Sequence, residues 1–123
     1  MAVENITVAY VEDEPAIAEL LRSGLGLFGI NVSPVYGTAE EAQEQILSGG
    51  VDADVLIFDI RLPGMTGLEL AQHLREKGET RPFLIVSAYH PPTPGQLEEL
   101  GAAFMPKPFD FAGIVGTIQN LLG

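Results

Sequence analysis

The sequence predicts an α/β protein, a five-stranded parallel sheet with helices on both faces. Two observations carry this prediction. Short apolar runs alternate with segments of helical periodicity along the whole chain, five of each, and elements that alternate in this way pack as a parallel sheet between layers of helices. The chain has 123 residues, 46% hydrophobic and 19% charged, which is typical of one globular domain.

The first strand and helix are marked by a change of hydrophobic period. Residues 6–11 form a short apolar run, and apolar residues then recur at helical spacing over 17–28, with Pro15 suited to a first helical turn. A second strand is predicted over 30–36. Pro34 lies within it, and because proline cannot donate to the ladder, we expect this strand at an edge of the sheet.

The centre of the chain continues the alternation. A capping-box pattern over 38–41 opens a helix that should run to about Leu47, where two glycines end it. Residues 55–58 are the most apolar strand and lead directly into Asp59. A carboxylate is therefore expected at the end of a buried strand.

The second half repeats the scheme. Residues 62–65 carry proline and glycine where a type II turn needs them, and a capping box over 66–69 starts a helix to about Lys77. The fourth strand, 83–86, ends at Ser87.

The last two units are shorter. A capping-box pattern over 93–96 opens only a short helix, and the three prolines within residues 90–94 disfavour helix in the residues before them. Residues 102–105 are a fifth strand, and apolar residues over 114–122 mark an amphipathic final helix.

Charge and composition exclude several functions. Seventeen acidic residues oppose six basic ones, for a net charge of −11, and such a field repels nucleic acid. There is no cysteine and no apolar run near the length of a membrane span. The first ten residues hold Glu4 and no basic residue, unlike a secretory signal. We expect a cytoplasmic protein that binds neither nucleic acid nor membrane.

Polar residues follow the predicted strands. Glu12 and Asp13 follow the first, Asp59 the third, Ser87 the fourth and Lys107 the fifth. Each alone has a structural explanation, such as a helix start matched to the helix dipole or a surface lysine. Because the carboxyl ends of parallel strands share one edge, where such sheets bind ligands, their joint placement favours a functional site.

These residue types suit phosphoryl transfer. Crowded carboxylates at 12, 13 and 59 repel one another, and a hard cation such as Mg²⁺ relieves that repulsion with carboxylate and phosphate oxygens. Asp59 would attack as a carboxylate nucleophile. The ammonium of Lys107 would neutralise charge, and Ser87 could donate a hydrogen bond to the phosphoryl group.

The chain resembles the receiver domain of two-component response regulators over essentially its whole length. Any one of the matching segments would be weak, whereas together they are specific. They are Val11–Pro15, Val55–Gly67, Ile85–Ala88, Gly101–Ala102 and Lys107–Phe109.

The resemblance implies a flavodoxin-like (βα)5 fold with strand order 2-1-3-4-5. It also implies that Asp59 is the phosphoacceptor and that Glu12 and Asp13 form an acidic pocket for Mg²⁺, with Asp13 the closer ligand. The backbone carbonyl of Arg61 is the further metal ligand that the family implies.

Further roles follow from the same resemblance. Ser87 and Phe104 take the positions of switch residues, although Phe104 by spacing alone reads as core, and Lys107 stabilises charge. The Lys107–Pro108 peptide bond is expected to be cis. Arg61 and Tyr89 lie beside the approach of the water that removes the phosphoryl group, so we expect them to control dephosphorylation.

The expected partners are a sensor histidine kinase or a histidine phosphotransfer protein, and an unknown downstream protein. The chain stops with its last helix, so we expect one receiver domain over residues 1–123, without an effector domain, that acts as a signalling switch and catalyses only its own phosphorylation and dephosphorylation.

Three alternatives compete. A haloacid-dehalogenase-like phosphatase needs a second aspartate two residues after the nucleophile, where this chain has Arg61. A flavodoxin-like cofactor carrier needs a phosphate-binding loop after the first strand, where this chain has acids. An unphosphorylated pseudo-receiver that only binds proteins is the third.

Overall fold

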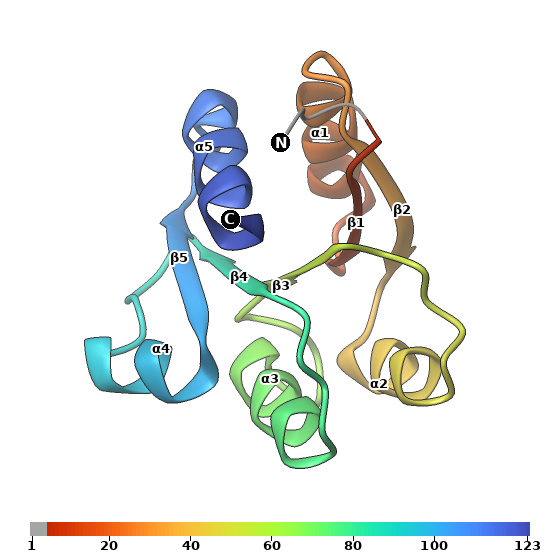
Figure 1. Ribbon diagram of the computed structural model, residues 1–123, viewed down its shortest axis with the longest axis vertical. Helices are drawn as coiled ribbons and strands as arrows, with labels where there is room; N and C mark the ends of the chain where they lie inside the picture. Colours follow the sequence, from red (N-terminus) through yellow and green to blue (C-terminus); the bar gives the residue numbers. More distant parts are fainter. Residues whose placement is uncertain (1–4) are drawn as a thin grey trace.

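The computed structural model describes residues 5–123, so Glu4 lies outside the described residues. Five parallel strands form one sheet in the order β2-β1-β3-β4-β5, with α1 and α5 on one face and α2, α3 and α4 on the other (Figure 1). The predicted fold class and strand order are confirmed. In chain order the elements are β1 (Thr7–Val11), α1 (Pro15–Gly26), β2 (Asn31–Tyr36), α2 (Ala39–Leu47), β3 (Val55–Asp59), α3 (Gly67–Glu76), β4 (Phe83–Ser87), α4 (Pro94–Leu100), β5 (Ala102–Pro106) and α5 (Phe111–Leu122).

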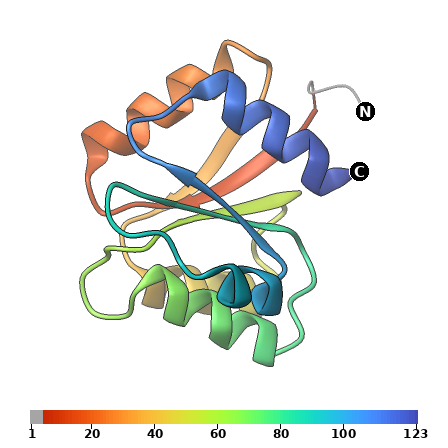
Figure 2. The same cartoon turned by 90° about the vertical axis from the view of Figure 1, so that its left-hand side faces the viewer.

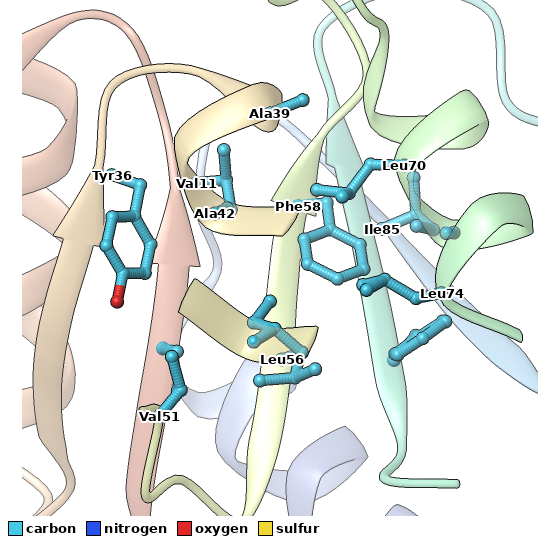
Figure 3. Close-up of a cluster of buried hydrophobic side chains, with 14 of the residues drawn as sticks. Val11, Tyr36, Ala39, Ala42, Val51, Leu56, Phe58, Leu70, Leu74 and Ile85 are labelled. Atoms are coloured by element: carbon cyan, nitrogen blue, oxygen red, sulfur yellow. The ribbon is translucent and has the colours of Figure 1, made fainter. Parts of the chain in front are cut away.

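The sheet separates two hydrophobic cores, because successive side chains of a strand point to opposite faces. Every residue of β3 and β4 is buried, which identifies them as the central strands. Under α2, α3 and α4, Phe58 points toward Leu70 and Leu74 (Figure 3) and packs edge-on against Phe83, with 5.0 Å between ring centroids. Across residues 5–123, none of the helices is both long and apolar enough to cross a membrane.

The edge position of β2 is confirmed. Within residues 5–123, β2 pairs only with β1, and the pairing register shifts between Val8 and Tyr10, opposite Pro34. A shift here fits a residue that has no N–H to give to the ladder. The Ser33–Pro34 peptide bond is cis, which the sequence did not indicate, and the predicted cis Lys107–Pro108 bond is confirmed.

Threonine caps start three of the helices, as their sequence patterns predict. Thr66 and Thr93 form complete capping boxes with Glu69 and Gln96. At α2 the Thr38 hydroxyl accepts from the backbone N–H of residue 41 at 3.2 Å, which is one half of such a box.

The turn before α3 combines local geometry with a contact from another helix. Gly64 has φ 72°, as a type II turn requires at that position. The N–H of Met65 donates to Glu40 Oε2 of α2 at 3.0 Å. A side chain of α2 therefore holds the loop that follows β3.

The predicted short helix α4 forms, and Arg75 of α3 holds its carboxyl end. Nε of Arg75 donates to the carbonyl oxygen of Leu100 at 2.7 Å, and its guanidinium carbon lies 3.6 Å from the centroid of the Phe83 ring. Gly101 then ends the helix in the left-handed conformation, with φ 62°.

We predict that the segment from Tyr89 to Leu100 has the fastest amide hydrogen exchange of the sheet and helix region in the unphosphorylated protein. Pro92 and Leu100 are its only buried residues, and a helix of seven residues is marginal without packing. Exchange followed residue by residue with NMR checks this. Protection here equal to that of β3 and β4 would contradict it, and slower exchange after phosphorylation would show that activation orders the segment.

Candidate functional site

The loops that leave the carboxyl ends of the strands gather at one edge of the sheet, at the left of Figure 2. Asp59 and Ser87 are the last residues of β3 and β4, and both side chains are buried. A cleft of about 570 Å³ opens at this edge. Its lining includes Asp13, Asp59, Arg61, Tyr89 and Lys107.

Lys107 joins two carboxylates at the base of this site. Its Nζ lies 2.6 Å from Asp59 Oδ2 and 2.7 Å from Glu12 Oε1. Burial disfavours the ammonium, but the hydrogen bonds and charges of Asp59 and Glu12 outweigh burial and hold the pKa of Lys107 above its ordinary value. Lys107 therefore remains a cation, although its side chain is only 15% exposed.

A backbone hydrogen bond also fixes the position of Lys107. The Lys107 N–H donates to the carbonyl oxygen of Ser87 at 2.9 Å, so the residue continues the pairing of β5 with β4. The lysine sits one residue beyond the end of β5. Because its backbone is paired with β4, Lys107 is held at the sheet edge with its ammonium beside the carboxylates.

The acidic pocket has an inner and an outer part. Glu12 is 3% exposed and does not line the cleft, whereas Asp13 and Glu14 are exposed and line it. One carboxylate oxygen from each of the three lies within 4.8 Å of the others. Glu12, Asp13 and Asp59 against Lys107 leave a formal charge of −2, and an all-oxygen set of this charge fits a hard divalent cation such as Mg²⁺.

Close packing holds Asp59 in place. Its Oδ1 accepts from the N–H of Arg61 at 3.2 Å. The N–H of Gly67 donates to the carbonyl oxygen of Ile60 at 3.0 Å, and a Cβ on Gly67 would collide with the Asp59 carbonyl oxygen. Glycine at the start of α3 is therefore needed for the helix to pack directly against the backbone of Asp59.

The two predicted switch residues lie on neighbouring strands. The Ser87 hydroxyl is buried and accepts from the N–H of Tyr89 at 3.1 Å. Phe104 pairs with Ile85 across β4 and β5 and is half-buried against the core under α3 and α4. Phe104 thus has a packing role, and its switch role stays a prediction.

Arg61 and Tyr89 contact each other at the mouth of the cleft. The Arg61 guanidinium carbon lies 4.2 Å from the centroid of the Tyr89 ring, within range of a cation–π interaction. Tyr89 is 59% exposed. The family resemblance predicted both residues beside the approach of the attacking water but gave no sign that they stack on each other.

Sequence reasoning missed Tyr10, which it treated as an ordinary strand residue. Tyr10 is fully buried, and its hydroxyl donates to Glu12 Oε1 at 2.9 Å. Burial, followed by the charge of Glu12, raises the pKa of Tyr10 far above its ordinary value, so it stays protonated. The available signal was the spacing, because residues two apart on a strand point to the same face.

This fold, with an acidic cluster and a paired lysine at the carboxyl edge of its sheet, defines a signalling module of the receiver class. The family model described as the response regulator receiver domain matches residues 8–119, and the chain belongs to this family. Receiver domains are signalling modules that act as phosphorylation-dependent switches and bind Mg²⁺ at an acidic pocket.

Curated relatives include two transcriptional regulatory proteins. FixJ of Azorhizobium caulinodans is 32% identical over 98% of this chain and 56% of its own length. TrcR of Mycobacterium tuberculosis is 32% identical over 95% of this chain and 45% of its own length. The chain spans about half the length of the curated relatives it matches.

Solved structures agree with the fold. The response regulator TrrA of Thermotoga maritima, solved in complex with Mg²⁺-BeF, is 30% identical, with a TM-score of 0.81 over 95% of this chain and 99% of that chain. The receiver domain of the hybrid histidine kinase CckA is 26% identical, with a TM-score of 0.75 over 95% of this chain and 99% of that chain.

Proposed function

We propose that this receiver domain takes a phosphoryl group onto Asp59 with the help of Mg²⁺ and thereby changes the surface that it offers to a partner. The observation that carries the proposal is the triad of Glu12, Asp59 and Lys107, in which one ammonium is shared by two buried carboxylates. Beside it, Asp13 and the loop at Arg61 line an open cleft. A nucleophile, a cation and a place for a metal are thus in one site.

In the proposed step, a carboxylate oxygen of Asp59 forms a bond to phosphorus while the bond between phosphorus and the donor breaks. The electron pair of the broken bond leaves with the donor, which is the imidazole of a phosphohistidine or the acetate of acetyl phosphate. Asp59 reacts as a carboxylate, so no proton has to be removed first. The product is an acyl phosphate on Asp59.

The chain's own residues position and neutralise the reacting groups. The Lys107 ammonium pairs with the Asp59 carboxylate and is placed to pair with the phosphoryl oxygens once the phosphoryl group is attached. Asp13, Asp59 and the carbonyl of Arg61 would hold Mg²⁺, with Glu12 behind them. When bound, Mg²⁺ neutralises phosphoryl charge and orients the phosphoryl oxygens.

The partners we propose are a histidine kinase or a histidine phosphotransfer protein as donor and a protein as downstream target. A phosphoryl oxygen that drew a hydrogen bond from Ser87 would turn its hydroxyl, which now accepts from the Tyr89 N–H. Ser87 pairs with Pro106 of β5, and Phe104 lies two residues earlier on the same strand, opposite Ile85. This is the route by which we expect the surface of α4 and β5 to change.

Two alternatives are separable from this proposal. A phosphatase of the haloacid-dehalogenase type would need an acid or base where Arg61 stands, and Arg61 stacks on Tyr89 instead. A pseudo-receiver would bind partners without taking up phosphate. Labelling decides between a receiver and a pseudo-receiver.

Acetyl phosphate with Mg²⁺ should add one phosphoryl group to the intact protein, observed as a mass increase that EDTA prevents and hydroxylamine removes. Dependence on Mg²⁺ follows from the residual negative charge of the pocket, and sensitivity to hydroxylamine identifies an acyl phosphate. A protein that stays unmodified under conditions that label a known receiver domain would contradict the proposal and favour the pseudo-receiver.

A further inference from the structure

Tyr10 connects the hydrophobic core to the acidic pocket. Its ring lies in the core between the sheet and helices α1 and α5, together with Leu21, Ile57 and Ile114. Its hydroxyl reaches past the end of β1 to the buried carboxylate of Glu12. A phenylalanine would fill the same core volume, so packing alone does not explain the hydroxyl.

The two oxygens of the Glu12 carboxylate have different hydrogen-bond partners. Oε1 accepts from the Tyr10 hydroxyl at 2.9 Å and from Lys107 Nζ at 2.7 Å. Oε2 accepts only one contact in the described part of the chain, from the N–H of Glu14 at 3.2 Å. Because Tyr10 and Lys107 both hold Oε1, the carboxylate cannot rotate without losing two donors, and Oε2 is left toward the loop that carries Asp13.

We propose that Tyr10 is a positioning residue of the magnesium pocket, which fixes the rotation of the Glu12 carboxylate so that Oε1 anchors Lys107 while Oε2 supports the bound cation. The inference rests on the function proposed above and adds a residue to it. The Tyr10 hydroxyl touches no reacting atom and acts only through Glu12. Outer partners of this kind set the orientation of the groups that hold a metal or its water.

Tyr10 also affects where the Lys107 ammonium lies between Glu12 and Asp59. Without the tyrosine donor, Lys107 is the one side chain of the described residues left on Glu12 Oε1. The ammonium would then be drawn toward Glu12 and away from Asp59, which it now contacts at 2.6 Å. Loss of the hydroxyl should therefore change the hydrogen bonding of Glu12 and Lys107 in the metal-free protein, before Mg²⁺ is added.

The test compares Tyr10→Phe with the parent protein, and Tyr36→Phe is the matched control. Tyr36 is also a buried strand tyrosine, but it lies on β2, in the core on the opposite face of the sheet. Mg²⁺ titrations followed by calorimetry and by the amide resonances of Asp13 and Ala88 give the dissociation constant. We expect Tyr10→Phe to bind Mg²⁺ roughly tenfold more weakly, as for loss of an outer-shell partner, and Tyr36→Phe to bind as the parent does.

A second set of measurements separates positioning from mere support of the fold. The carboxyl ¹³C resonance of Glu12 in metal-free protein should shift in Tyr10→Phe and stay in place in Tyr36→Phe. The rate of labelling by acetyl phosphate should need more Mg²⁺ for half-saturation in Tyr10→Phe, yet approach the rate of the parent once Mg²⁺ is saturating. A structural defect would lower the rate at every Mg²⁺ concentration.

Each outcome decides the question. If the parent binds Mg²⁺ and Tyr10→Phe binds it equally well with an unmoved Glu12 resonance, the inference is overturned while the proposed function stands. If the parent itself binds no Mg²⁺, the proposed function fails, and the inference fails with it. Weaker binding with a shifted Glu12 resonance supports both.

Discussion

Asp59→Asn should abolish uptake of a phosphoryl group, whichever donor is used. The asparagine side chain has nearly the shape of aspartate, but its single oxygen can accept from only one of the two donors on the carboxylate, Lys107 Nζ at Oδ2 or the N–H of Arg61 at Oδ1. Its amide oxygen is too poor a nucleophile to form an acyl phosphate. The change therefore removes the reacting group and leaves the site's packing in place.

The variant should also stay folded, which makes the loss interpretable. Glu12 and Asp59 are both buried and share one ammonium, so a neutral residue at 59 relieves like-charge repulsion. We expect the thermal midpoint of unfolding in EDTA to be no lower than that of the parent. Asp52→Asn, at an exposed position before β3, is the control for loss of one negative charge and should be labelled normally.

Intact-protein mass spectrometry after incubation with acetyl phosphate and Mg²⁺ provides the measurement. Labelling of Asp59→Asn at a rate near that of the parent would mean that another residue is the nucleophile. The acid pocket would then need to be reassigned, starting from Asp13, one of the two exposed carboxylates that line the cleft.

The elements of this fold were predictable because their signals are local. The period of apolar residues separates strands from helices, and the threonines at 66 and 93 form the capping boxes that their sequence patterns indicate. Pro34 marks an edge strand because proline has no N–H to donate to a neighbouring strand. The convergence of Asp59, Ser87 and Lys107 on one edge then follows from parallel pairing alone.

The features that the sequence did not show are contacts between distant segments. Arg75 caps the end of α4, twenty-five residues away in sequence, and stacks on Phe83. Glu40 holds the loop after β3 at the N–H of Met65. Both residues read from sequence alone as ordinary charged positions on a helix surface, because nothing in their neighbourhood along the chain records what packs against them.

The phosphorylated form of this protein should be long-lived, and loss of the pair formed by Arg61 and Tyr89 should shorten its lifetime. Hydrolysis requires a water in line with the bond between phosphorus and Asp59, on the open side of the cleft. Both side chains line that cleft and stack at 4.2 Å. Neither is a carboxylate or an imidazole that could take a proton from the water, because Arg61 offers only N–H donors and Tyr89 offers a phenolic hydroxyl.

The contact between Arg61 and Tyr89 predicts that the two side chains act together and not independently. Arg61 follows β3 and Tyr89 follows β4, so their stacking joins the two loops that flank Asp59. If this bridge is the shield, either single change opens it. Arg61→Asn and Tyr89→Ala should then each give most of the effect of the Arg61→Asn/Tyr89→Ala double variant, a non-additivity expected of residues in direct contact.

A time course of dephosphorylation after removal of the donor tests both points. We expect Arg61→Asn with Tyr89→Glu to lose phosphate roughly ten- to a hundredfold faster than the parent, since the new groups can orient water as well as admit it. Tyr89→Ala admits water without adding a base and so isolates shielding. Arg22→Asn, an exposed arginine of α1, controls for lost positive charge. A double variant that loses phosphate no faster than the parent would show that the lifetime is set elsewhere, and additive single effects would show that the two side chains act without their contact.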